Sequence, residues 1–179
     1  KIISTGQGGL IMTNDHTLNE KIIRLKDHGR LSRTESSFPV PGYNFKFTDL
    51  QASIGLAQFE KLSGRLEKAK KDHRFYRNSL AEVKGIRLVP VADSSCIVPL
   101  WVDATSDRKE ELMTTMKGKN IELRPFWECL HKQWTGVDPA FYPNSCEAER
   151  TGFWLPSGPA LETEKMEIVC REIKNFFAS

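Results

Sequence analysis

Apolar residues change their spacing several times along this chain of 179 residues, and each spacing predicts a different element. Residues 2–13 are mainly apolar on both sides of the glycine-rich stretch TGQGG, which predicts two short strands around a sharp turn. Apolar residues at helical spacing come next: Leu18, Ile22 and Leu25. They predict a helix that Asn14 or Asp15 caps and that Gly29 ends.

The periodicity disappears in residues 30–46, RLSRTESSFPVPGYNFK, and a loop of this length is typical of a functional or mobile segment. Thr48 and Gln51 then have the spacing of a capping box, in which two side chains bond to each other's backbone. Apolar residues follow at helical spacing: Leu50, Ile54, Ala57, Leu62, Leu66 and Ala69. They predict a long helix to about Leu80, which the Ser-Gly pair at 63–64 could bend or divide.

Short elements alternate after Gly85. The stretches IRLVPV, CIVPLWVD and IELRPFW predict strands, and residues 107–117 predict a helix. Residues 132–152 look irregular. The final stretch, LPSGPALETEKMEIVCREIKNFF, predicts a helix with three residues on its apolar face: Ile168, Ile173 and Phe176. This order predicts a small α+β unit over residues 63–179, while residues 1–62 read as the end of a larger α/β domain.

Composition narrows the class of protein. Hydrophobic residues make up 39% and charged residues 27%, which is an ordinary balance for a soluble globular protein. The sequence holds no run of 18 apolar residues that could cross a membrane. The net charge is +3. The densest patch of basic residues, KLSGRLEKAKKDHR, has helical spacing with acidic residues nearby. A solvated helix face explains this patch better than a nucleic-acid surface, which would interleave aromatic residues.

Four cysteines, Cys96, Cys129, Cys146 and Cys170, form no C-x-x-C pair and match no common zinc spacing. We therefore expect reduced thiols in the cytoplasm and no metal site. A catalytic pair of Cys129 and His131 is an alternative, because residues two apart on a strand face the same side. Nothing else in the sequence supports that pair.

The GQGG stretch is no dinucleotide fingerprint, because a strand and not a helix is expected after it. Its context is more specific, since the order of motifs along the chain resembles the nucleotide-sugar aminotransferases of the DegT family. Five motifs carry this resemblance: KIISTGQGGLIMTND, LKDHG, PGYNFKFTDLQASIGLAQFEKL, NIELRPFWECLH and FWLPSGPAL. It covers essentially the whole chain but only about half of a family member. The upstream half, with most of the cofactor pocket, is expected to be missing.

The resemblance implies a fold and a cofactor. The expected fold is α/β, that of the PLP-dependent transferases (aspartate aminotransferase-like), where PLP is pyridoxal 5′-phosphate. Residues 1–62 would be the end of the PLP-binding large domain with the start of its spine helix. Residues 63–179 would be the small C-terminal domain. The resemblance also implies a cytoplasmic homodimer whose active site is shared between subunits.

The resemblance also assigns roles to residues. Lys1 would hold the PLP aldehyde covalently and, once released, move a proton as base and acid, which suits an amine that loses its proton readily when desolvated. Lysine at this place favours amino transfer over the dehydration that histidine-bearing relatives perform. Asn44 would donate a hydrogen bond to the PLP phosphate of the other subunit. Tyr43 and Lys46 could face cofactor or substrate, although lysine lacks the bidentate fork of the arginine common there.

The substrates are implied in the same way. His131 would lie near the sugar of a nucleotide-linked keto-sugar, which receives an amino group from L-glutamate. Arg124 could pair with the diphosphate of this substrate or merely with a nearby carboxylate. The motifs look most like perosamine-synthase-like members, and the product would enter polysaccharide biosynthesis. This chain alone is expected to be inactive, because no motif supplies the aspartate that pairs with the pyridine nitrogen. The alternative is a non-catalytic regulatory or interaction member of the same family.

Overall fold

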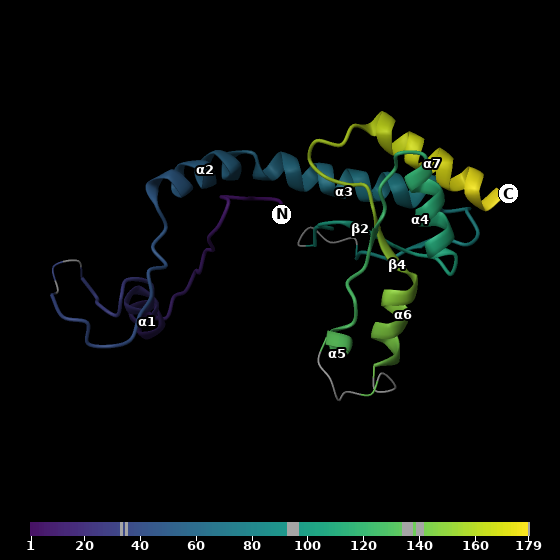
Figure 1. The fold of residues 1–179 in the computed structure, drawn as a ribbon. Helices are drawn as coiled ribbons and strands as arrows, with labels where there is room; N and C mark the ends of the chain where they lie inside the picture. The colour runs from purple at the N-terminus through teal and green to yellow at the C-terminus, as the bar shows by residue number, and fades with distance from the viewer. Residues whose placement is uncertain (33, 35, 93–96, 134–137, 139–141, 179) are drawn as a thin grey trace. The chain divides into compact units, whose positions relative to one another are not determined.

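The computed structural model describes residues 1–32, 34, 36–92, 97–133, 138 and 142–178, and the chain divides into two compact units (Figure 1). The first unit comprises Ile3–Leu62 together with Lys1, and the second comprises Ser63–Ser179 together with Ile2. Within the described ranges, every helix is too short or too polar to span a bilayer.

The first unit contains helices α1 (His16–Lys26) and α2 (Asp49–Glu60). Asp15 caps α1, because its carboxylate accepts the Leu18 N–H at 3.0 Å. The capping box predicted at the start of α2 is present. Thr48 Oγ1 accepts the Gln51 N–H at 3.3 Å, and Gln51 Oε1 accepts the Thr48 N–H at 3.1 Å.

The strands predicted within residues 2–13 are absent from the structure, and that prediction is wrong. A strand is stabilised by hydrogen bonds to a neighbouring strand, and no described segment forms a ladder with this one. Its apolar side chains are consequently exposed, Leu10 to 84% and Met12 to 86%. The helix predicted from Thr48 to about Leu80 is divided into two helices, and the break lies at Lys61, the C-cap of α2, and not at residues 63–64.

The second unit is built on an antiparallel sheet with the strand order β1-β2-β4-β3. Its strands are β1 (Arg87–Leu88), β2 (Val102–Thr105), β3 (Arg124–Pro125) and β4 (Gly152–Leu155). Ala104 lies opposite Phe153 in the register of β2 and β4. The strands predicted from IRLVPV and IELRPFW shrink to two residues each. The strand predicted from CIVPLWVD starts later than expected, and Cys96 in it lies outside the described residues.

Three helices supply the rest of the core: α3 (Leu62–Ser79), α4 (Lys109–Gly118) and α7 (Thr163–Ala178). The fully buried side chains come from helices and strands alike: Tyr76, Leu112, Met116, Phe153 and Ile173. The α7 helix buries Ile173 and Phe176 as predicted, but Ile168 is 42% exposed. Ile168 was assigned to the wrong face, because Val169 and Cys170 are the buried residues of that turn.

The irregular structure predicted for residues 132–152 is also wrong in its described part. Helix α5 (Leu130–Gln133) extends into this range, α6 (Pro143–Thr151) fills its end, and β4 follows directly. Residues 134–137 and 139–141 lie outside the described residues. Helix α6 carries no apolar stripe that could have predicted it, because Thr151 is its one buried residue.

Candidate functional site

The glycine turn that follows Lys1 is fastened to the start of α2. Lys1 itself is exposed. Gln51 Nε2 donates a hydrogen bond to the Gln7 carbonyl at 3.3 Å across 44 positions of sequence. Gly8 has φ +122°, and a Cβ at this position would overlap the ring of Phe47. Glycine is therefore required there both by backbone conformation and by the close approach of the aromatic ring.

A second contact joins the LKDHG and PGYN motifs. The Tyr43 N–H donates to the Leu25 carbonyl at 2.7 Å, and the Tyr43 carbonyl accepts the His28 N–H at 3.0 Å. Asn44 lies opposite Asp27 in an isolated antiparallel bridge. The last turn of a helix leaves its carbonyl groups without partners inside the helix. Here the backbone of the loop supplies two of those partners, because the Phe45 N–H also donates to the Lys26 carbonyl at 3.0 Å, and these bonds fix the residues on either side of Asn44.

Gly29 and Gly42 allow the loop backbone to lie close to the end of α1. A Cβ on Gly42 would overlap the backbone nitrogen of Gly29, and a Cβ on Gly29 would overlap the carbonyl oxygen of Val40. Gly29 also has φ +90°. The first residue after the helix cap Asp27 is, however, His28, with φ +57°. The helix thus ends one residue earlier than the sequence predicted, in a left-handed histidine followed by the glycine.

Asp27 is the polar centre of this contact, and the sequence analysis missed it. Its buried carboxylate accepts hydrogen bonds from Lys46 Nζ at 2.9 Å and from Arg30 Nε at 3.3 Å. The hydrogen bond from Lys46, and then that from Arg30, lower the pKa of the Asp27 carboxyl, against the opposing effect of burial. Lys46 thereby anchors the loop that carries Asn44. The signal in the sequence was the LKDHG motif, in which Asp27 is the one acidic residue and stands between Lys26 and His28.

The side chains of the GYN motif remain accessible on this anchored backbone. Asn44 is exposed, and the Tyr43 ring stacks on Phe45 with centroids 4.9 Å apart and planes 9° from parallel. An exposed amide on a fixed backbone has two N–H donors available to an anion.

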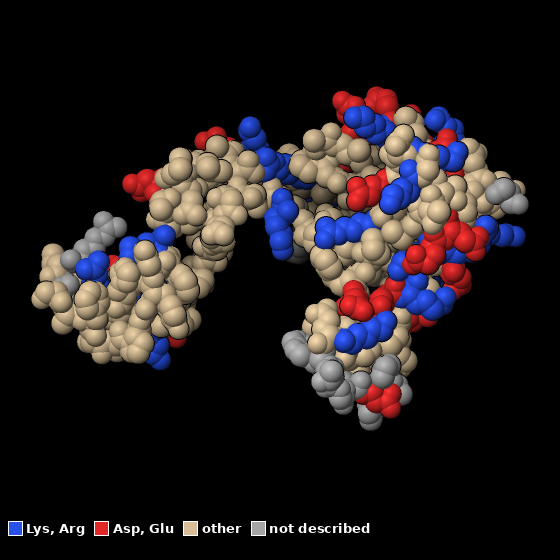
Figure 2. All heavy atoms as spheres, in the orientation of Figure 1, with Lys and Arg blue, Asp and Glu red and all other residues tan. Residues whose placement is uncertain are grey.

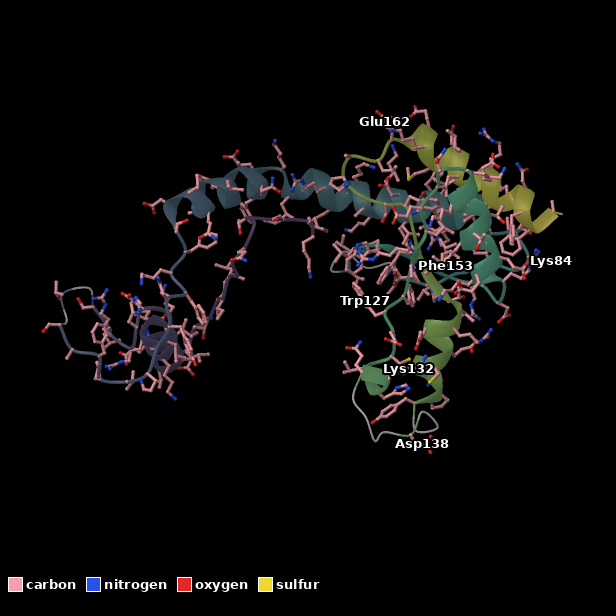
Figure 3. All side chains as sticks on the ribbon, in the orientation of Figure 1. Lys84, Trp127, Lys132, Asp138, Phe153 and Glu162 are labelled. Carbon is pink, nitrogen blue, oxygen red and sulfur yellow. The ribbon has the colours of Figure 1, made fainter. Side chains whose placement is uncertain are left out.

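Arg124 belongs to the second unit and lies in a group of aromatic rings. Its guanidinium carbon is 4.6 Å from the centroid of Trp127 and 5.5 Å from that of Trp154. Trp127 is 63% exposed and meets Trp154 edge-on at 5.4 Å (Figure 3). The arginine therefore presents a permanent positive charge on planar, partly exposed aromatic faces.

His131 lies on α5, where its ring stacks on Tyr142 with centroids 5.4 Å apart. Its Nε2 atom is 3.6 Å from Cys146 Sγ. The predicted residues Lys1, Tyr43, Asn44 and Lys46 thus belong to the first unit, and Arg124 and His131 belong to the second.

The alternative of a catalytic Cys129–His131 pair gains no support. A hydrogen bond to the Glu149 carboxylate, together with burial, raises the pKa of the Cys129 thiol to about 11. The Glu149 carboxylate also accepts the Cys129 N–H at 3.0 Å and pairs with Lys132 Nζ at 2.6 Å (Figure 3). A nucleophilic cysteine must be a thiolate, and this thiol stays protonated at neutral pH.

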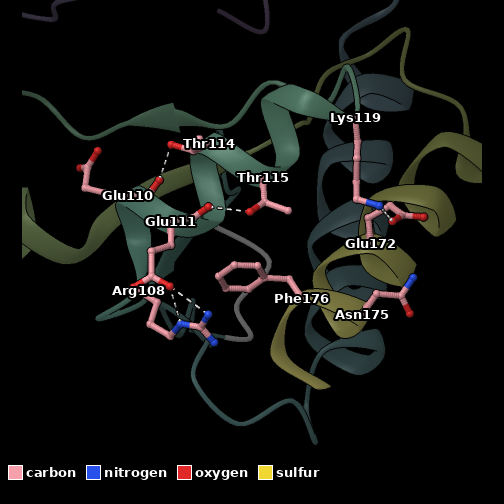
Figure 4. Close-up of a pocket in the computed structure, with 9 residues that line it drawn as sticks. All are labelled: Arg108, Glu110, Glu111, Thr114, Thr115, Lys119, Glu172, Asn175 and Phe176. Atoms are coloured by element: carbon pink, nitrogen blue, oxygen red, sulfur yellow. Dashed lines mark hydrogen bonds and ion pairs between the residues drawn. The ribbon is translucent and has the colours of Figure 1, made fainter. Parts of the chain in front are cut away.

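A pocket of about 750 Å³ lies between α4 and α7, and none of these residues lines it (Figure 4). Its charged groups already pair with each other, Arg108 with Glu111 at 2.9 Å and Lys119 with Glu172 at 2.7 Å. The Arg108 guanidinium also covers the ring of Phe176, with 4.3 Å between its carbon and the centroid. The pocket is thus a surface hollow bounded by satisfied ion pairs.

Known proteins share this sequence and fold. The profile of the DegT/DnrJ/EryC1/StrS aminotransferase family matches residues 1–174. GDP-perosamine synthases of Escherichia coli O157:H7 and Vibrio cholerae are 29% and 30% identical over 99% of the chain, which covers 50% of each. The aminotransferase TlmJ from Streptoalloteichus hindustanus superposes with a TM-score of 0.87 at 22% identity, over 99% of this chain and 50% of its own. The chain therefore spans about half the length of the relatives it matches.

Proposed function

Because the chain belongs to the DegT/DnrJ/EryC1/StrS aminotransferase family, we propose that it is part of an enzyme that moves an amino group from L-glutamate to a nucleotide-linked keto-sugar. The family match over residues 1–174 is the observation that carries this proposal. Aminotransferases of this family use pyridoxal phosphate. The two GDP-perosamine synthases support a nucleoside-diphosphate sugar as the substrate. The spore coat polysaccharide biosynthesis protein SpsC of Bacillus subtilis, which is 24% identical over 98% of this chain, supports polysaccharide biosynthesis as the process.

The chemistry of the residues present fits this cofactor. Lys1 offers a primary amine for the aldehyde, and the exposed amide of Asn44 offers donors for a phosphate. The cofactor would supply the electron sink that withdraws charge from the reacting carbon. Gln51 and Phe47 hold the turn that follows Lys1, so the segment carrying the amine is tied to α2. This attachment supports a fixed position for the group that moves the proton.

Lys1 would have two tasks in succession. Its amine would first hold the cofactor in place. After release, the amine would accept a proton from the amino-bearing carbon of the substrate and deliver it to the cofactor carbon C4′. Arg124 would contact the diphosphate, for which its fork of N–H groups is suited. His131 would contact the sugar, and Tyr43 would line the cofactor or the substrate. Lys46 would act mainly through Asp27, by keeping the loop of Asn44 in place.

The first unit also supports the homodimer that we propose. Large apolar side chains are exposed along its residues: Leu10, Met12, Phe45, Phe47, Leu50, Leu56 and Phe59. In Figure 2 the spheres of this unit are mainly uncharged. Exposed apolar surface of this extent favours burial against further protein, and a second subunit would supply part of that cover. In a homodimer, Asn44 would serve the cofactor phosphate held by the other subunit.

The assignment of Lys1 can be tested by reducing the whole, cofactor-loaded protein with borohydride and mapping its peptides. We expect the pyridoxyl label on Lys1, and we expect Lys1→Ala to lose both the label and amino transfer. Lys21→Ala is the control, because Lys21 is an equally exposed lysine on α1. A label on another lysine would overturn the assignment. A whole protein that takes up no label and shows no cofactor absorbance would instead be the non-catalytic member of the family.

The amino donor can be tested on the same preparation. L-Glutamate should convert the bound cofactor to its amine form and release 2-oxoglutarate, whereas L-aspartate should do so much more slowly. Equal conversion by both amino acids would reject glutamate as the specific donor. Residues 1–179 alone are expected to show no turnover, because the sequence offers no motif for the acid that pairs with the pyridine nitrogen.

A further inference from the structure

Two cysteines and a histidine gather in the second unit, and only the histidine, His131, has a role in the proposed reaction. Cys129 directly precedes α5, His131 lies on α5, and Cys146 lies on α6. Their sulfur and ring-nitrogen atoms all lie within 4.8 Å of one another. Cys129 is only 5% exposed, and Cys146 and His131 are half-buried. The cluster is thus formed by the packing of two helices that are joined by a longer stretch of chain.

We propose that Cys129, His131 and Cys146 bind a thiophilic divalent metal ion, with zinc as the expected ion. Zinc–sulfur bonds of about 2.3 Å and zinc–nitrogen bonds of about 2.0 Å place tetrahedral ligands about 3.5–3.8 Å apart. The 3.6 Å between His131 Nε2 and Cys146 Sγ already has this length. No two ligand atoms are more than 4.8 Å apart, so a small side-chain movement brings all three to bonding distance of one ion. Two thiolates and an imidazole favour zinc over hard ions such as magnesium or calcium.

The surroundings orient the three ligands. The Glu149 carboxylate accepts the Cys129 N–H and pairs with Lys132, so it holds the residue at the start of α5 against α6. The ring of Tyr142 stacks on His131 and fixes the plane of the imidazole. Such partners behind a metal ligand are part of a built site. The fourth position is left to a water molecule or to the Glu149 carboxylate.

Metal binding would exchange the protons of the two thiols for the metal ion. Each thiol loses its proton to solvent as the ion binds, so a dithiolate–imidazole site releases two protons per ion and involves no change of oxidation state. The spacing C-x-H followed by a distant cysteine matches no common zinc pattern, which is why the sequence alone predicts no metal site.

The site would clip together two short helices that bury little else. Helix α5 has four residues, and α6 has nine, of which Thr151 is buried. A metal on Nε2 of His131 leaves Nδ1 to carry the proton, so the imidazole could still donate a hydrogen bond to a substrate. The metal site does not involve Lys1 and stands or falls independently of the proposed transfer of an amino group.

The test uses the whole protein, kept reduced with a phosphine, and titrates it with Zn²⁺ and with Co²⁺. We expect one ion per chain, with the thiolate-to-metal charge-transfer band and the intense visible bands of tetrahedral Co²⁺. Cys146→Ala and His131→Gln should each weaken Zn²⁺ binding at least about tenfold. Cys170→Ala is the matched control, because Cys170 is a buried cysteine of α7 outside the cluster, and this variant should bind like the unchanged protein.

Thermal unfolding of each variant, recorded without metal, shows that the fold is retained before affinities are compared. If Cys146→Ala does not fold, His131→Gln decides the outcome. A reduced protein that takes up no ion, or one whose Cys146→Ala and His131→Gln variants bind as tightly as before, overturns the proposal. Recovery of a Cys129–Cys146 disulfide peptide from a protein that binds no metal after reduction also overturns it.

Discussion

His73 shows what burial does to a single titratable side chain. It is 5% exposed, and within the described part of the chain its Nε2 atom has no hydrogen-bond partner. Burial, the largest effect, and the nearby Arg77 lower the pKa of His73, while a hydrogen bond to the Val89 backbone and the Asp103 carboxylate oppose them. The folded state therefore disfavours the charged imidazole.

The sign of the resulting pH dependence follows from proton binding. Below the unfolded pKa of about 6.5, the unfolded chain takes up a proton that the folded chain still excludes, so the free energy of unfolding falls as the pH falls. Urea unfolding at about pH 7.5 and about pH 5.5 should show this loss. His73→Gln, which cannot titrate, should lose less stability between the two conditions. Identical losses in both proteins would show that other groups govern the acid sensitivity.

Gly42 and Gly64 offer a matched pair of glycine-to-alanine changes. A Cβ on Gly42 overlaps the Gly29 backbone, so Gly42→Ala should destabilise the loop of Asn44 by about 1–3 kcal/mol. A Cβ on Gly64 in α3 meets open space, so Gly64→Ala should stabilise by about 0.5–1 kcal/mol through reduced chain entropy. Hydrogen exchange of the Tyr43 and Phe45 amides, which bond to the end of α1, reports the first change, and that of α3 reports the second. Equal protection from exchange in the unchanged protein, Gly42→Ala and Gly64→Ala would contradict the predicted overlap at Gly42.

At the scale of elements, the start of α2 depends on its capping box. Thr48→Ala removes the acceptor of the Gln51 N–H and should cost about 1 kcal/mol, which hydrogen exchange of the first-turn amides of α2 measures. Thr114→Ala on the exposed face of α4 is the control, because the Thr114 hydroxyl bonds only to its own helix at Glu110. That change should be neutral or slightly stabilising. A larger effect of Thr114→Ala would show that the cap is not the cause.

Elements differed in how far sequence could predict them. The helices with clear caps, α1 and α2, begin where the capping residues indicated, because a cap is made by residues a few positions apart. Helix α6 and strand β4 were missed. The strand β4 is defined by pairing with β2 and β3, and its partners lie about 30–50 positions upstream along the chain.

At the scale of the whole molecule, the proposed sharing of the active site makes a prediction of its own. Lys1→Ala and Asn44→Ala should each lower activity as homodimers. Mixed dimers of the two variants should regain up to about half of the activity per site, since one of their two sites would contain both intact residues. Co-expression with two different affinity tags and a rate measurement on the mixed species checks this. Mixed dimers no better than the two parents would place Asn44 with the Lys1 of its own subunit.

The sequence by itself determined the family, the capped starts of α1 and α2, and the order of the motifs, because these depend on residues near one another in the chain. Only the tertiary structure decided that Asp27 holds Lys46 and Arg30 beneath the loop of Asn44, or that Cys146 meets His131. The Cys146–His131 contact joins residues 15 positions apart, and the Asp27–Lys46 contact joins residues 19 positions apart. Neither periodicity nor a local motif predicts contacts between residues so far apart in the sequence. These contacts form when helices and loops pack to bury apolar surface and to satisfy backbone groups.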